Sequence, residues 1–204
     1  MGRSGLDKVW KILRSSRARF ALIHGVILMV LLIYINSLPA KADAIRLTEN
    51  FEPGAAQAFE HALTPLIDTV ILDVSGGYLT EGLEIGRIIR ARQMRVIVPA
   101  GATCLSACAE AFLGGVQMQI DGTLAFHIPR VVRSSSRNQA FSQGLTGGTL
   151  TAIYRYEMGF GFDLTRSINR WTTSNRLLAF ESTAELMRYK GPGSGAQLPR
   201  FYQY

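Results

Sequence analysis

The sequence predicts an α/β domain with a parallel sheet, preceded by an N-terminal membrane-spanning helix. Two runs, Val70–Val74 and Arg95–Val98, have the nearly continuous apolar character of buried parallel strands. Segments with apolar residues at helical spacing follow them, over Thr80–Arg92 and Ser106–Leu113. This alternation predicts right-handed crossovers between parallel strands, and such sheets bind ligands at the carboxyl ends of their strands. The membrane helix is predicted from one long apolar run, Phe20–Ile35.

Composition limits the size and the partners of the folded part. With 204 residues and 48% hydrophobic content, the chain is expected to form one compact domain plus an apolar appendage. The net charge is +7, but residues 1–19 hold six basic residues against one acidic residue, which is +5 and leaves +2 for the rest. The basic character therefore belongs to the N-terminus, and we expect no nucleic-acid partner for the domain.

The N-terminal pattern predicts export. Residues 1–19 form a basic cytoplasmic lead, and 20–38 form a transmembrane signal anchor in the bacterial inner membrane. An alternative is a signal peptide ending near residue 44, because Ala42–Ala44 offers a cleavage site. Either way the α/β domain, 45–191, is expected in the periplasm, with 192–204 as a flexible tail.

The first part of the domain holds few chemical candidates. A short strand is expected at Ile45–Thr48 and a helix at about Gly54–Leu63. His61 on this helix is a rival catalytic base, although a surface or capping role is the simpler interpretation. Asp73 is expected to accept hydrogen bonds from neighbouring loop N–H groups.

Three short segments bring together the groups needed for acyl transfer. Ser106 lies at a strand-to-helix junction, where its hydroxyl can act as a nucleophile or only as a helix cap. The paired glycines Gly76 and Gly77 permit positive φ and close backbone approach, so an N–H of their loop could face that hydroxyl. His127 ends the next apolar run, before Pro129, and could serve as the base.

The region after His127 predicts two helices and two irregular segments. Arg130–Arg137 reads as an exposed basic loop, with an anion site as the alternative. Gln143–Gly148 is glycine-rich and is expected to be mobile. Helices are expected near Thr149–Met158 and Asp163–Thr172.

The last segment of the domain, Phe180–Gly191, predicts a small helix that ends in glycine. Ser182 is a suitable N-cap, and Glu185 three residues later completes a capping box.

Several of these segments together resemble the Clp protease and crotonase superfamily, and more closely its periplasmic Clp-like members. The resemblance runs from about residue 45 to 191 and rests on SGG at Ser75–Gly77, CLSAC at Cys104–Cys108, the Gly114-Gly115 pair, FHIP at Phe126–Pro129 and the closing segment from Phe180. It implies a repeated ββα spiral, and the assembly of several copies into a homo-oligomer. It also implies that Ser106 is the nucleophile, that His127 is the base, and that the N–H groups of Gly77 and Ala107 form the oxyanion hole.

One catalytic position departs from the family pattern. Where the family has its acid, this chain has Leu178. The third member normally fixes the tautomer of the histidine. Asn175 could replace it by accepting the imidazole N–H through its carbonyl oxygen, whereas Asp163 and Glu181 are less well placed.

The two cysteines, Cys104 and Cys108, flank Ser106. They can be small buried packing residues, a disulfide or, least simply, a reactive thiol. No cysteine and histidine spacing typical of a zinc site is present, so we expect neither a metal nor another cofactor.

The leading functional hypothesis is a Clp-like serine hydrolase with a Ser–His dyad, acting on peptides or proteins. The alternative is a catalytically inactive binding or assembly domain that kept the fold, which the missing acid favours. A crotonase-like enzyme acting on acyl thioesters is a weaker third hypothesis, because an exported domain has little access to coenzyme A.

Overall fold

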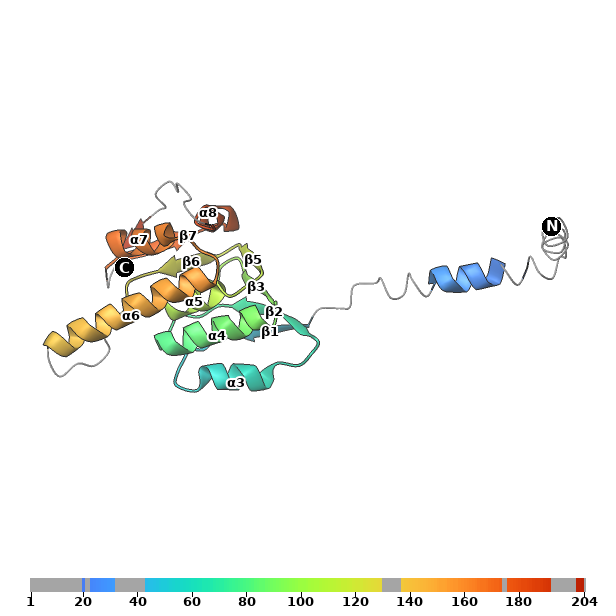
Figure 1. Ribbon diagram of the computed structural model, residues 1–204, viewed down its shortest axis with the longest axis horizontal. Coiled ribbons are helices and arrows are strands. Elements are labelled where there is room, and N and C mark those ends of the chain that lie inside the picture. Colours follow the sequence, from blue (N-terminus) through green and yellow to red (C-terminus); the bar gives the residue numbers. More distant parts are fainter. Residues whose placement is uncertain are drawn as a thin grey trace, which may run out of the picture. The chain divides into compact units, whose positions relative to one another are not determined.

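The protein is described by a computed structural model that covers residues 20, 23–31, 43–129, 137–173, 176–191 and 201–203 (Figure 1). The chain divides into two units, Met1–Lys41 and Ala42–Tyr204, and each is considered by itself.

In the first unit, residues 23–31 are helical. Their large apolar side chains are exposed, as is that of Phe20. Part of the predicted anchor, including 32–38, lies outside the described residues, and so does the basic lead 1–19. Among the residues that are described, no helix combines the length and the apolar character needed to cross a membrane.

The second unit contains two four-stranded sheets among its described residues. The first sheet has the order β1 (Asp43–Leu47), β2 (Ile67–Leu72), β3 (Arg95–Val98), β5 (Gln117–Ile120), and its neighbouring strands are parallel. The second has the order β4 (Thr103–Leu105), β6 (Thr123–Phe126), β7 (Arg176–Phe180), β8 (Phe201–Gln203), with β4 and β6 parallel and the other pairs antiparallel. The α/β class predicted from the sequence is confirmed.

Helices follow the strands in a regular rhythm. They are α3 (Ala55–Ala62), α4 (Leu79–Ala91), α5 (Ala107–Phe112), α6 (Arg137–Glu157), α7 (Phe162–Trp171) and α8 (Thr183–Met187). Of the four apolar residues that the helical pattern of α4 contains, Leu83, Ile85 and Ile89 are buried in the core, and Ile88 is half-buried against it. Ser182 caps α8 by accepting a hydrogen bond from the Glu185 N–H at 3.3 Å, so the predicted cap is confirmed.

From β2 to α6 the chain alternates between the two sheets, and each passage through both sheets is followed by a helix. One unit is β3, β4 and α5, and the next is β5, β6 and α6. The preceding unit has β2, then Val74 bridged to Cys104 of β4, then α4. The segments that follow the second strand of each unit therefore lie next to one another, at the ends of β4 and of the strands beside it.

Helices α4 and α5 pack with their backbones nearly in contact. A Cβ atom added to Gly82 would lie 2.3 Å from the carbonyl oxygen of Ala107, and one added to Gly114 would lie 2.1 Å from that of Gly86. Any larger side chain at these points would force α5 away from α4. The glycines thus fix the position of α5, the helix that begins directly after Ser106.

One prediction for the C-terminal part was wrong, because the glycine-rich segment Gln143–Gly148 is helical and lies within α6. Of the predicted tail, 192–204, the structure describes β8 at Phe201–Gln203. Tertiary packing outweighs the low helix propensity of glycine here, because α6 is anchored by buried Tyr154 and buried Gly147 lies against Pro129. The loop expected at Arg130–Arg137 lies outside the described residues, except that α6 begins at Arg137.

Candidate active site

Ser106 occupies a sharp turn between β4 and α5. Its backbone has φ 56° and ψ −118°, and Gln93 is the other non-glycine residue with positive φ among those described. This conformation is nearly forbidden to residues with a Cβ and costs about 1–3 kcal/mol, so it persists only where the surroundings impose it. A strained strand-to-helix turn of this kind projects a serine hydroxyl out of the backbone, as at the nucleophile of α/β hydrolases.

Backbone hydrogen bonds hold this turn on several sides. The Ser106 N–H donates to the Ala125 carbonyl at 2.9 Å, and the Leu105 N–H donates to the Val74 carbonyl at 3.0 Å. On the helical side, the Glu110 N–H donates to the Ser106 carbonyl at 3.1 Å. The residues around the hydroxyl are therefore tied to β6, to the end of β2 and to α5.

A disulfide spans the same turn. It joins Cys104 of β4 to Cys108 of α5, with their Cα atoms 5.2 Å apart, and both residues are fully buried. The disulfide geometry that is difficult within one helix is met because Cys104 belongs to the strand instead. The sequence left three alternatives open for the two cysteines, namely packing residues, a disulfide and a reactive thiol. The structure contains the disulfide.

The diglycine loop lies directly beside Ser106. Gly76 and Gly77 have φ of 120° and 135°, which disfavours any other residue. A Cβ atom added to Gly76 would lie 3.1 Å from the Ser106 Cβ and 3.6 Å from its Oγ. Only a glycine thus lets this loop approach the hydroxyl so closely.

Two backbone N–H groups are candidates for an oxyanion hole. Gly77 forms a parallel bridge with Phe51, in which the Phe51 N–H donates to Gly76 and the Phe51 carbonyl accepts from Tyr78, each at 2.8 Å. In this pairing the N–H of Gly77 points away from Phe51, toward the side on which β4 lies. Ala107 is the first residue of α5, where N–H groups have no carbonyl partner within the helix.

His127 leaves the second sheet at the end of β6, the strand next to β4. Leu105 is paired in register with Ala125, so Ser106 and His127 follow the adjacent carboxyl ends of parallel strands. The Nδ1 atom of His127 lies 2.6 Å from the carbonyl oxygen of Ile128. Because a carbonyl oxygen can only accept, this contact places the proton on Nδ1 and makes Nε2 the basic nitrogen.

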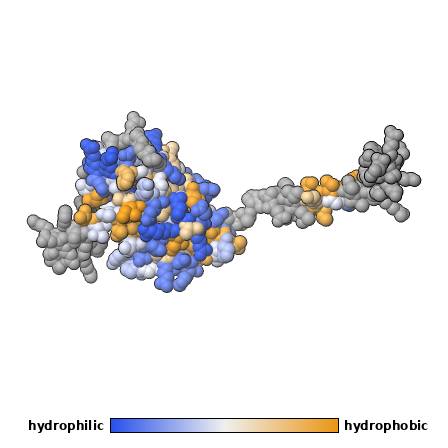
Figure 2. Space-filling model, viewed as in Figure 1, coloured by the Kyte–Doolittle hydropathy of each residue, from blue (hydrophilic) through white to orange (hydrophobic). Residues whose placement is uncertain are grey.

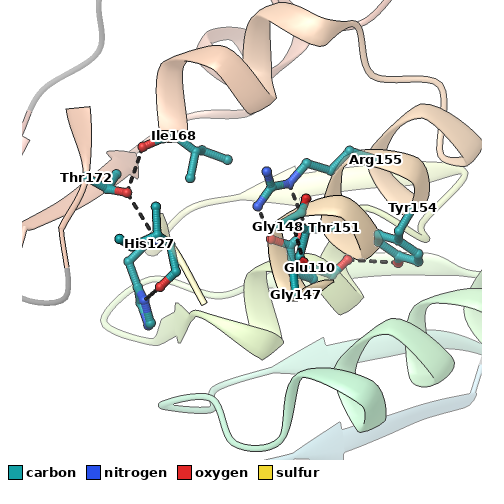
Figure 3. A network of polar contacts seen from close by, with 10 residues as sticks. Glu110, His127, Gly147, Gly148, Thr151, Tyr154, Arg155, Ile168 and Thr172 are labelled. Carbon is teal, nitrogen blue, oxygen red and sulfur yellow. Dashed lines mark hydrogen bonds and ion pairs between the residues drawn. The ribbon is translucent and has the colours of Figure 1, made fainter. Parts of the chain in front are cut away.

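Thr172 fixes the segment that carries His127. Its buried hydroxyl accepts a hydrogen bond from the Ile128 N–H at 3.1 Å and donates to the Ile168 carbonyl at 2.7 Å. Figure 3 shows His127 and Thr172 on one side of the network, linked to α7 through these contacts. Thr172 could not be predicted from the sequence, since a threonine just after a helix carries no distinctive signal.

The third catalytic member remains a prediction. Asn175 lies outside the described residues. Leu178, at the position where the resembled family has its acid, is buried in β7 opposite Phe126 and belongs to the core. Asp163 pairs with Arg166 at 3.2 Å on α7, and exposed Glu181 follows β7.

The remaining candidates have simple structural roles. His61 is exposed in the last turn of α3. The carboxylate of Asp73 accepts a hydrogen bond from the Thr103 N–H at 3.2 Å, as expected of an acid near a strand end. Within the described ranges, no group of three acidic, cysteine or histidine side chains is arranged to hold a metal ion.

A buried ion pair connects α5 to α6 behind the turn. Glu110 and Arg155 are 3% and 1% exposed, and their side chains form two charge-assisted hydrogen bonds (Figure 3). The Arg155 guanidinium also stacks over the ring of Phe126, 5.8 Å from its centroid. Nearby, the Tyr154 hydroxyl donates to the Glu110 carbonyl at 2.9 Å, and burial together with the Glu110 charge raises the pKa of Tyr154. The sequence signal for this pair is the charged Glu110 in an otherwise small and apolar helix.

An open apolar groove begins next to the His127 segment. It has a volume of about 720 Å³ and runs between Ile128-Pro129, α6 and α7. Its most exposed apolar side chains are Leu145, Ile153, Tyr156 and Phe162. Hydrophobic residues are visible on the part of the surface where α6 lies (Figure 2).

Comparison with solved structures identifies the fold. A ClpP1 mutant from Listeria monocytogenes superposes with a TM-score of 0.54 at 14% identity, over 72% of this chain and 86% of that one. The ClpP protease catalytic domain from Plasmodium falciparum gives a TM-score of 0.50 at 15% identity, over 77% and 87%. No family model matches the sequence. No curated protein matches it either. The chain therefore has a Clp protease-like fold, as the sequence resemblance implied.

Proposed function

We propose that this chain is a Clp-like serine hydrolase that cleaves peptide bonds, with Ser106 as nucleophile and His127 as base. The observation that carries the proposal is the strained turn at Ser106, pressed against a diglycine loop and level with the strand end that carries His127. A helix cap alone does not need this conformation, since cap residues ordinarily adopt extended backbone angles. Strain retained at one polar side chain favours a chemical role for it.

In the proposed reaction the Ser106 Oγ attacks the carbonyl carbon of the scissile bond. As the new carbon–oxygen bond forms, the hydroxyl proton moves to Nε2 of His127, and the carbonyl electrons move onto oxygen. The N–H groups of Gly77 and Ala107 stabilise the resulting oxyanion. The intermediate collapses when the carbon–nitrogen bond breaks and Nε2 returns the proton to the leaving amine. Water then hydrolyses the acyl-enzyme by the same steps.

The missing acid is compatible with this proposal. A carboxylate in a triad holds the imidazole in one tautomer and orientation. The Ile128 carbonyl performs part of that role through Nδ1 of His127, and Thr172 holds Ile128 in turn. Asn175 is proposed as an alternative acceptor for the same imidazole N–H. We therefore expect a dyad, with a lower rate than a complete triad would give.

The proposed location is the periplasmic side of a bacterial inner membrane, with residues 20–38 as the anchor. The disulfide supports an oxidising compartment, because cytosolic thiols are normally kept reduced. The start of β1 at Asp43 favours the uncleaved anchor, since cleavage after Ala44 would remove the first two residues of that strand. Assembly into a homo-oligomer, implied by the family resemblance, is part of the same proposal.

A second candidate function is a catalytically inactive binding or assembly domain. Leu178, buried where the family has its acid, is the observation that favours it. The two candidates differ in whether the Ser106 hydroxyl is reactive.

The deciding experiment is labelling of the full chain, purified in detergent, with a fluorophosphonate probe. We expect Ser106→Ala to abolish labelling and His127→Ala to slow it by about 10²–10⁴-fold, the usual contribution of a general base. His61→Ala is the matched control, because it removes an exposed histidine from α3 and should label at the wild-type rate.

Two results would reject the hydrolase. One is equal labelling of wild type and both variants, which would mean that another residue reacts. The other is a folded wild-type chain that is never labelled, which would support the inactive domain.

A further inference from the structure

We infer that Cys104 and Cys108 are positioning residues for Ser106, and that their disulfide holds the nucleophile in its reactive conformation. This inference rests on the proposed function and deepens it. It assigns to the bridge a role in the chemistry instead of a role in overall stability.

The bridge closes a short ring around Ser106. The two cysteines are four residues apart, and Ser106 is the midpoint of the ring that they close. A disulfide stabilises a fold more when it closes a longer loop of the unfolded chain, so a ring this short contributes less to overall stability than a long loop would. Its largest effect falls on the five residues that it encloses.

The residue at the centre of this ring has a strained backbone. Ser106 has a backbone conformation that a residue with a Cβ leaves unless its neighbours prevent it. Relaxation of φ and ψ at Ser106 would change the angle between β4 and α5. The bridge restrains that angle, because one cysteine lies on the strand and the other on the helix.

Burial shields the disulfide from reductants. Both cysteines are fully buried between the end of β4, which is bridged to Val74, and α5, which packs closely on α4. A reductant reaches the bridge only after local opening, so the disulfide acts as a permanent clamp and not as a readily reversible switch. The N–H of Ala107, proposed for the oxyanion hole, lies inside the same ring.

The test compares the oxidised full chain with the variant Cys104→Ala/Cys108→Ala and with reduced wild type. In the reduction, an excess of dithiothreitol breaks the Sγ–Sγ bond. The two cysteines gain two electrons and two protons to become thiols, and dithiothreitol becomes a cyclic disulfide. Reduced wild type keeps both sulfur atoms, so it removes the bond with almost no change in packing.

The first readout is the second-order rate of fluorophosphonate labelling. We expect it to fall by about 10- to 100-fold in both forms without the bridge, the range for a catalytic group displaced by up to about 1 Å. Reoxidation should restore the rate. The pH at which labelling is half-maximal should stay unchanged, because His127 is untouched. Ile85→Val removes a buried carbon from α4 and should leave the labelling rate at the wild-type value.

The second readout is amide hydrogen exchange at Leu105 and Ser106, whose N–H groups are hydrogen-bonded to Val74 and Ala125. Loss of the bridge should speed exchange at these two amides while Ile85 and Ile89 of α4 keep their protection. Unchanged exchange at the turn, or an unchanged labelling rate in a labelled protein, would overturn the inference. If wild type is never labelled, the proposed function fails, and the exchange measurement still decides whether the bridge holds the turn.

Discussion

The two strand ends that carry the proposed catalytic pair are held in very different ways. At the end of β4, Ser106 is restrained by three backbone hydrogen bonds, a disulfide and the tight packing of α5 on α4. At the end of β6, the contacts of the segment with His127 include the Ile128 carbonyl, one threonine hydroxyl and the packing of Pro129 against Gly147. The proposed nucleophile needs its support because its backbone is strained, whereas the imidazole needs an orientation. The comparison predicts that damage near β4 costs more stability than damage near β6, and that damage at either end slows the proposed chemistry.

The largest expected effect comes from the buried ion pair behind the nucleophile. Arg155→Met leaves the Glu110 carboxylate buried without its partner and should lower the free energy of unfolding by about 3–5 kcal/mol. The double variant Glu110→Leu/Arg155→Met removes both charges and should recover much of that loss. Urea unfolding of the two variants measures the difference, and equal losses would mean that the unpartnered Glu110 carboxylate is not what destabilises the single variant.

The next effect concerns the diglycine loop. In Gly77→Ala the new methyl group would lie 2.5 Å from the backbone of Phe51 at a positive φ, and should destabilise the protein by about 2–5 kcal/mol. Gly101→Ala is the control, because Gly101 also has positive φ but open space around its Cβ position, and should cost about 1 kcal/mol. Thermal unfolding compares the two. Similar losses would show that the loop can move away from Phe51.

At the β6 end, Thr172→Val should weaken both the stability of the protein and the positioning of His127. Loss of the hydroxyl leaves the Ile128 N–H without its acceptor, which costs about 1–3 kcal/mol. It also frees the His127 segment, so labelling of Ser106 should slow by about tenfold or more. Thr172→Ser keeps the hydroxyl and should restore the rate. A valine variant that labels at the wild-type rate would show that Thr172 does not orient the base.

The smallest effect isolates the strain at the nucleophile. Ser106→Gly and Ser106→Ala both remove the hydroxyl and should both abolish labelling. Glycine accepts the observed φ and ψ without a steric penalty, so the glycine variant should be more stable than the alanine variant by about 1 kcal/mol. The reverse order in chemical unfolding would mean that Ser106 is not strained in solution.

Much of the architecture could be predicted from local patterns. Apolar runs and helical spacing located β2, β3, α4 and α5, and the capping box located α8, because burial and capping leave short-range signals. The glycine-rich start of α6 was mispredicted, since its helix is stabilised by contacts with residues far away in the sequence.

The residues of the candidate site likewise include some that local sequence patterns predict and some that they do not. Ser106, His127 and Gly77 could be named because each follows a predicted strand, and the structure puts Ser106 and His127 at neighbouring strand ends. Thr172 and the pairing of Glu110 with Arg155 could not be found, since each joins elements more than forty residues apart. The backbone angles of Ser106 also have no signature in the sequence.

The alternation of strands between the two sheets has a consequence for how such a site can change over time. Gly77, Ser106 and His127 emerge at matching points of three consecutive β–β–α units, so each of these three units contributes one group to the proposed site. Lengthening a crossover helix at its far end would leave all three directions intact. Inserting a single residue in β4 or β6 would turn the following side chain to the opposite face. We therefore expect changes of helix length to leave the proposed site intact and changes of strand length to disrupt it.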